Sequence, residues 1–67
     1  MKGYRLITDD DTVEFCKRVT EALSNGWELY GEPKMTFDSK RGIMRCAQAV
    51  VKESSKKYSN DIDLSSI

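Results

Sequence analysis

Three stretches of the chain have the hydrophobic pattern of β-strands, and a fourth has the pattern of a helix. The segment from Met1 to Thr8 is rich in Tyr, Leu, Ile and Thr, which predicts a strand. From Asp11 to Asn25 the apolar residues recur every three or four positions, which predicts an amphipathic helix that Gly26 ends. The apolar stripe of this helix consists of Phe15, Cys16, Val19, Ala22 and Leu23.

The second half of the chain has the pattern of a β-hairpin. Residues 27–38 alternate in two registers, and residues 43–53 do the same after a turn at 39–42. Gly31 and Pro33 weaken ladder pairing within the first of these strands, because proline has no amide to donate. We therefore expect that strand to bend or bulge between Gly31 and Pro33 and to lie at a sheet edge.

This order of elements predicts an α+β fold of the type β-α-β-β. A right-handed crossover with the third strand antiparallel between the other two gives a three-stranded, mainly antiparallel sheet in the order 1-3-2, with the helix packed on one face. Residues 1–53 are expected to form the single domain, and residues 54–67 a polar, flexible C-terminal tail. The predicted core is Leu6, Phe15, Val19, Leu23, Trp27 and Leu29.

One helix leaves the other face of the sheet uncovered. In the third strand, the small side chains of Ala47 and Ala49 favour the odd-numbered set toward the helix, although one bulge would reverse this assignment. The even-numbered set then becomes an exposed patch on a domain too small to bury a large core, which predicts self-association as a dimer or a larger oligomer. The candidate interface or ligand residues are Tyr30, Met44, Cys46, Gln48 and Val50.

Composition and charge narrow the classes of function. The 67 residues include 11 Lys and Arg, 11 Asp and Glu, two Cys and no His. The balanced charge removes the usual electrostatic argument for a nucleic-acid or membrane partner. The absence of imidazole, of a catalytic motif and of a metal-ligating cluster makes an enzyme the least supported class, and we expect no cofactor and no metal. Cys16 and Cys46 are thirty positions apart and form no CxxC motif, so we expect reduced thiols. Together with the absence of a signal or membrane-spanning segment, this favours a cytoplasmic location.

Two classes of function stay open at this point. The first is a homo-oligomeric binding module that presents its sheet or the clefts between subunits to a host protein or a small metabolite. The alternative is an accessory nucleic-acid-binding regulatory domain that uses the basic second half, with Lys40, Arg41 and Arg45 as candidate anion contacts. The acidic run at residues 9–11 is expected to cap the helix by satisfying amides of its first turn.

Several segments of the chain resemble a known small family. They are YRLIT at 4–8, FCKRVTEALSNGWELYGEP at 15–33, a phenylalanine at 37 and AQAVVKE at 47–53. Together they resemble the family catalogued as domain of unknown function 1737, which usually has a glycine where this chain has Asp9. The family consists of short proteins of bacteria and their viruses, so the resemblance implies a bacterial, prophage or phage origin. It implies no activity.

Overall fold

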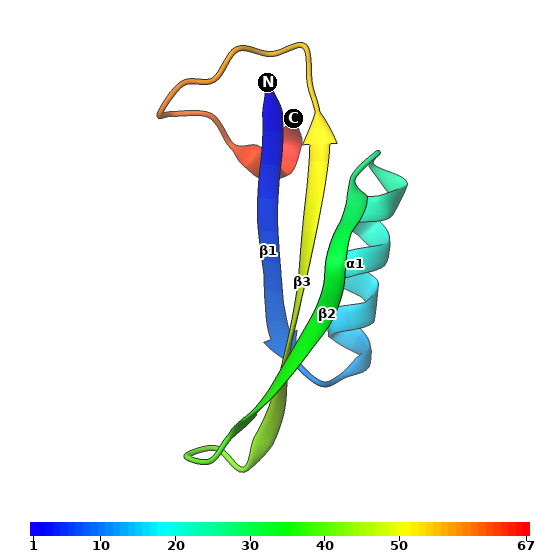
Figure 1. Cartoon of the computed structure of the whole chain (residues 1–67), viewed down its shortest axis with the longest axis vertical. Coiled ribbons are helices and arrows are strands. Elements are labelled where there is room, and N and C mark those ends of the chain that lie inside the picture. The colour runs from blue at the N-terminus through cyan, green and yellow to red at the C-terminus, as the bar shows by residue number, and fades with distance from the viewer.

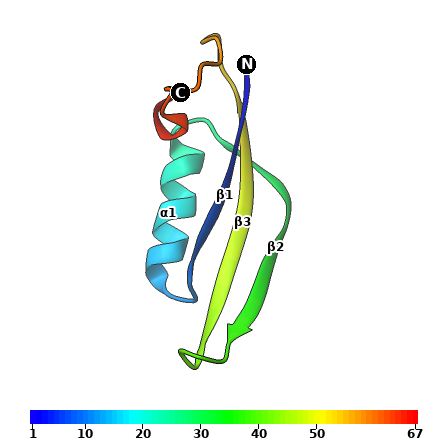
Figure 2. The same cartoon turned by 90° about the vertical axis from the view of Figure 1, so that its left-hand side faces the viewer.

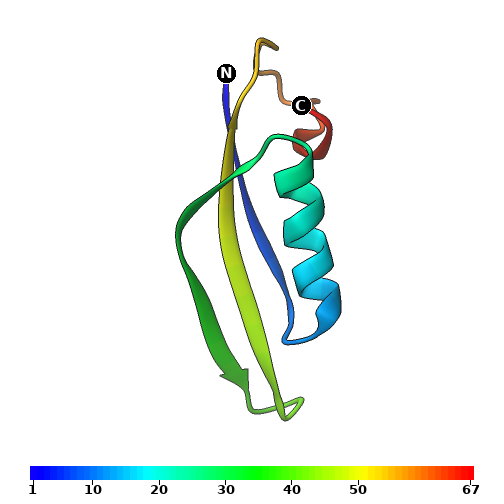
Figure 3. The same cartoon turned by 90° about the vertical axis from the view of Figure 1, so that its right-hand side faces the viewer.

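The computed structural model describes residues 1–67 and has the predicted order of elements (Figure 1). Strand β1 (Lys2–Asp10) is followed by helix α1 (Val13–Ser24), strands β2 (Glu28–Asp38) and β3 (Ile43–Glu53), and a short 3-10 helix, η1 (Leu64–Ser66). The sheet has the order β1-β3-β2, and both pairs of neighbours are antiparallel. Helix α1 lies on one side of this sheet (Figures 2 and 3). The α+β fold and the strand order predicted from the sequence are confirmed.

The junction between β1 and α1 differs from the prediction. Asp9 and Asp10 belong to β1, and the N-cap residue Thr12 makes no side-chain capping hydrogen bond. The prediction that the acidic run caps the helix was therefore wrong. These two carboxylates bind arginines instead: Asp9 lies 3.3 Å from Arg18, and Asp10 lies 2.8 Å from Arg45.

The C-terminal end of α1 follows the prediction and places the only tryptophan. Asn25 is the C-cap residue, and Gly26 has φ +91°, in the left-handed region that glycine adopts without strain. The amide of Trp27 then donates to the carbonyl of Ala22 at 3.0 Å. This tight reversal brings the indole back under the helix, where it is 2% exposed.

The core is small and lies between α1 and the two strands β1 and β3. It consists of Ile7, Ala22, Trp27 and Val50, and it is flanked by the partly buried Phe15, Val19 and Ile67. Three residues predicted for the core are exposed: Leu6 (55%), Leu23 (41%) and Leu29 (55%). Leu6 lies on the sheet face away from the helix, and Leu29 lies on β2, which diverges from α1 (Figure 3). Trp27, which was also predicted for the core, is buried in it.

The assignment of the two faces of β3 was reversed. Cys46, Gln48 and Val50 are buried on the helix side, whereas Ala47 and Ala49 lie on the opposite face. The register explains this arrangement because directly paired residues in an antiparallel ladder point to the same side. Ile7 pairs with Gln48 and faces the core, so the whole even-numbered set follows it.

The bulge predicted in β2 is present. Tyr30 pairs with Ala49 and Lys34 pairs with Ala47, so that residues 31–33 all lie opposite Gln48. The Gln48 side-chain amide nitrogen donates toward the carbonyls of Ala49 (2.9 Å), Gly31 (3.3 Å) and Tyr30 (3.5 Å). The bulge inserts an even number of extra residues, so the alternation of β2 continues unchanged beyond it.

The segment after β3 returns to the domain. The sequence predicts a flexible tail here, but in the structure η1 lies beside the C-terminal end of α1 (Figures 2 and 3). Ile67 packs against the core, and its carbonyl accepts a hydrogen bond from the Lys52 amine at 2.5 Å. Gly3 leaves room for this contact because a Cβ there would collide with Cδ1 of Ile67 and lie 3.2 Å from the Trp27 ring.

Candidate interaction surface

The sheet face that points away from α1, here called the open face, is covered by no other element (Figures 2 and 3). Large side chains stand on its two outer strands: Tyr4 is 52% exposed, Leu6 is 55% exposed and Tyr30 is 60% exposed. The register places Leu6 and Tyr30 on either side of Ala49 in the central strand. The apolar part of the open face consists of Tyr4, Leu6, Tyr30, Ala47, Ala49 and Val51.

Ala47 and Ala49 were expected to pack against the helix but lie on the open face, where their small side chains leave the centre of that face recessed. Near Ala47 the surface forms a shallow depression of about 300 Å³, whose lining includes Thr8, Lys34 and Arg45. Small residues flanked by large ones in this way give a surface into which a side chain of a partner can fit.

A second exposed apolar strip, here called the β2 strip, lies on the helix side of the sheet. It consists of Leu29, Met35 and Phe37, which are 55%, 56% and 58% exposed. These residues share the side of α1 because they pair with the even-numbered residues of β3. They are uncovered because α1 packs mainly over β1, while β2 diverges from the helix (Figure 3).

The far end of the β2–β3 hairpin extends beyond the rest of the sheet. The last pair of β1 joins Asp10 to Arg45, whereas β2 and β3 remain paired as far as Asp38 and Ile43. Figure 1 shows this end of the hairpin projecting past the start of α1. The end of the β2 strip therefore lies on an arm that extends beyond the last paired residue of β1.

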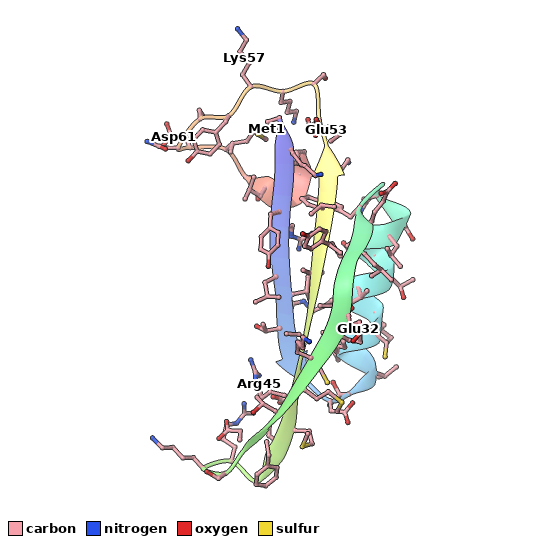
Figure 4. All side chains as sticks on the ribbon, in the orientation of Figure 1. Met1, Glu32, Arg45, Glu53, Lys57 and Asp61 are labelled. Carbon is pink, nitrogen blue, oxygen red and sulfur yellow. The ribbon has the colours of Figure 1, made fainter.

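An ion-pair cluster ties this arm to the end of β1. The Asp10 carboxylate accepts hydrogen bonds from Nη1 and Nη2 of Arg41, at 3.2 and 3.0 Å, and from Arg45 at 2.8 Å. Arg45 lies beside the end of β1, at the opposite end of the sheet from Met1 and Glu53 (Figure 4). The hydrogen bonds from Arg45 and Arg41 hold the pKa of Asp10 below its ordinary value, and Asp10 in turn raises the pKa of Arg45.

This cluster changes the expectation for the candidate anion contacts. Arg41 and Arg45 both bind Asp10, so their charges are largely compensated within the chain. Lys40 lies in the exposed turn, and its backbone amide donates to Asp38 at 3.1 Å. The three cations therefore do not form an unpaired basic patch.

The structure separates the candidate interface residues. Tyr30 lies on the open face, Met44 is half-buried, and the other three candidates are buried on the helix side: Cys46, Gln48 and Val50. The prediction that these three form the exposed patch was wrong. The hydrophobic pattern did not predict four exposed apolar residues: Tyr4, Leu6, Met35 and Phe37. The position of Trp27 could have indicated which face of β3 is buried. Trp27 and Leu29 alternate on the same side, so pairing of Leu29 with Val50 places Val50 with the helix.

The two cysteines are free and lie in different environments. Burial, the largest cause, and the nearby Asp11 raise the pKa of the Cys46 thiol, which disfavours the thiolate. Cys16 is exposed on α1 and is not bonded to Cys46. No group of three or more His, Cys, Asp or Glu side chains is placed to hold a metal ion. No helix has the length and apolar character required to span a bilayer.

The fold and the uncovered sheet define a small α+β domain with one helix on a three-stranded antiparallel sheet. The chain belongs to the family described as "Domain of unknown function (DUF1737)", whose model matches residues 1–53. The match ends at the last residue of β3. No curated protein and no solved structure matches the chain.

Proposed function

We propose that this chain is a non-enzymatic interaction module that associates with copies of itself through the uncovered surfaces of its sheet. The observation that carries the proposal is the distribution of apolar side chains. Seven of 67 residues are buried, whereas each of nine large hydrophobic residues is at least 41% exposed.

The exposed residues are grouped rather than scattered. Tyr4, Leu6 and Tyr30 share the open face, and Met35 and Phe37 share the β2 strip. Contiguous apolar surface of this kind on a soluble domain marks an interaction site, because burying one such side chain fully contributes about 1.5–3 kcal/mol. A domain with a four-residue core gains stability from a partner that covers such surface.

The ionisable groups support an interaction module better than an enzyme. The shifted pKa values are explained by an ion-pair cluster, by burial of a thiol and by two local hydrogen bonds from Ser65 to Asp63. These causes are structural, and they place no acid and base together at a cavity. The pairing of Arg41 and Arg45 with Asp10 likewise gives no support to the nucleic-acid alternative.

The test is the mass of the purified protein in solution. Sedimentation velocity at concentrations between about 1 and 100 µM should show species of two or more chains that increase with concentration. As a control, Lys57→Glu changes the charge of an exposed residue in the segment after β3, outside the sheet, and should leave association unchanged. A 7.7 kDa monomer at every concentration would overturn the proposal.

A further inference from the structure

We infer that the partner of the outer edge of β2 is a second copy of the same edge, paired antiparallel about a two-fold axis at Thr36. This inference rests on the proposed self-association and specifies its geometry. The paired segment is residues 34–38, with the sequence Lys-Met-Thr-Phe-Asp, on the projecting arm of the hairpin. It joins two three-stranded sheets into one continuous sheet of six strands.

The two sheet edges differ in how well they are covered. Strand β1 is flanked by other parts of the chain: the Arg18 guanidinium donates to the carbonyl of Thr8 at 2.8 Å, and η1 packs against the same strand. Along the arm, β2 pairs with β3 on one side and has no neighbour on the other. An uncovered edge presents unpaired amide and carbonyl groups that a further strand can satisfy.

The segment at residues 34–38 is complementary to itself. A two-fold axis at Thr36 places Lys34 opposite Asp38 of the second copy, and Met35 opposite its Phe37. Lys34 and Asp38 both lie on the open face, whereas Met35 and Phe37 both lie in the β2 strip, so each residue meets a partner of matching chemistry. Both contacts occur twice because the axis repeats them.

The side chains are available for these contacts. Met35 and Phe37 are 56% and 58% exposed, and Lys34 makes no ion pair within its own chain. One carboxylate oxygen of Asp38 accepts the amides of Lys40 and Arg41 in the turn, which leaves Oδ2 for the amine of a partner.

Charge also selects this register over its neighbours. Sheet faces match across a two-fold axis only when the axis passes through a residue, so the adjacent choices are Met35 and Phe37. Within residues 34–38, an axis at Met35 pairs Lys34 with Thr36, and an axis at Phe37 pairs Thr36 with Asp38. Only the axis at Thr36 places Lys34 opposite Asp38.

The bulge in β2 limits the length of the new pairing. Pro33 has no amide to donate, and the bulge at residues 31–33 moves the strand out of its regular path. Pairing therefore stops at Lys34. An interface of this size buries less than the ~1,200–2,000 Å² of a standard stable complex, so the dissociation constant is expected in the micromolar range.

The first experiment is cross-linking at the axis. Thr36→Cys, made with Cys16→Ser to remove the exposed native thiol, places two thiols directly opposite each other. Opposed Cα atoms in an antiparallel pair lie about 4.5–5.5 Å apart, within the ~4.4–6.8 Å span of disulfides. Oxidised glutathione takes the two electrons and two protons of these thiols, and a covalent dimer should form.

Lys40→Cys in the same background is the matched control. Its two thiols would be separated by eight residue positions along the paired strands, about 27 Å at about 3.4 Å per residue. Lys40→Cys should therefore give no rapid disulfide dimer. Equal dimer yields from the two variants would overturn the inference.

The second experiment is a reversal of charge. Lys34→Glu converts both symmetric Lys34–Asp38 contacts into repulsion and should raise the dissociation constant about tenfold. Lys57→Glu makes the same change in net charge in the segment after β3 and should leave the dissociation constant unchanged. An unchanged dissociation constant for Lys34→Glu would count against the edge pairing.

The outcomes separate this inference from the proposal on which it rests. A wild-type monomer overturns both. If the wild type forms oligomers, but Lys34→Glu does not weaken association and Thr36→Cys does not cross-link, the edge pairing alone is overturned. Association would then be assigned to the open face. Cross-linking together with a weakened Lys34→Glu dimer supports both.

Discussion

Replacement of Gln48 provides a direct test of how the bulge in β2 is held. The Gln48 side chain is buried, and its amide nitrogen faces the carbonyls of Tyr30, Gly31 and Ala49. Gln48→Met preserves the shape of the side chain and removes the donor. An unsatisfied buried polar group costs about 1–3 kcal/mol, and because Tyr30 and Gly31 lie on an exposed strand that water can reach, we expect about 1–2 kcal/mol.

The assay is thermal unfolding followed by circular dichroism at one fixed protein concentration. For a domain of this size, 1 kcal/mol corresponds to about 4–8 °C in Tm, so Gln48→Met should lower the Tm by roughly 5–15 °C. Thr20→Met, on the exposed part of α1, is the control for adding methionine and should have little effect. A Tm of Gln48→Met within about 1 °C of the wild type would refute the structural role of the amide.

A second variant at this position adds a pH dependence. Gln48→Glu replaces the donor with a carboxylate that faces carbonyl oxygens, and burial raises the pKa of that carboxyl in the folded state. A folded-state pKa above the unfolded value of about 4.3 means that the variant is most stable below that value, and that stability is lost as pH rises through the folded pKa. The protonated carboxyl keeps an O–H donor for these carbonyls, so Gln48→Glu should be at least as stable as Gln48→Met in acid and fall below it at neutral pH.

Three further predictions test the packing, the ion pairs and the thiols. Gly3→Ala introduces a Cβ against Trp27 and Ile67 and should cost about 1–3 kcal/mol in urea unfolding; unchanged stability would contradict the docking of the C-terminal segment. Asp10→Asn should lower stability at neutral pH. Because Arg45 and Arg41 hold the pKa of Asp10 below 3.8, its contribution is present above that pH and is lost as pH falls through the lower folded value. The difference from wild type should therefore close in acid, and a gap that does not change with pH would argue against the ion pairs. The exposed Cys16 should react rapidly with a disulfide reagent, whereas Cys46, whose thiol pKa burial raises, should react only on unfolding; two rapid thiols would contradict its burial.

The sequence was informative where local chemistry determines structure. The helix end at Asn25 and Gly26 follows from the conformational freedom of glycine, and the bulge follows from Pro33 in a strand. The strand order was predicted from a crossover between β1 and β2 with β3 antiparallel between them. These features depend on residues close together in the chain or on a general rule of connection.

The sequence was misleading where a long-range register decides the outcome. The faces of β3 depend on its pairing with β1 and β2, and the volume of Ala47 and Ala49 pointed to the wrong side. The acids at residues 9–11 have the composition of a helix cap, but Asp10 binds Arg45, which lies 35 positions away. A short-range pattern cannot distinguish a capping carboxylate from one that pairs with a distant guanidinium.

As a result, the candidate interface in the structure consists of other residues than those predicted. Cys46, Gln48 and Val50 are buried rather than exposed, whereas Met35 and Phe37 of β2 are exposed. The expectation of an uncovered apolar surface survives on different residues because one helix still faces a sheet with two sides. The edge position of β2, which the sequence predicted, is confirmed.

The most direct test of self-association through the sheet is the solution mass of the wild-type chain across a range of concentrations. Sedimentation equilibrium should give a mass that increases with concentration from 7.7 kDa toward at least twice that value. A mass that stays at 7.7 kDa at every concentration up to about 100 µM would contradict the proposed association.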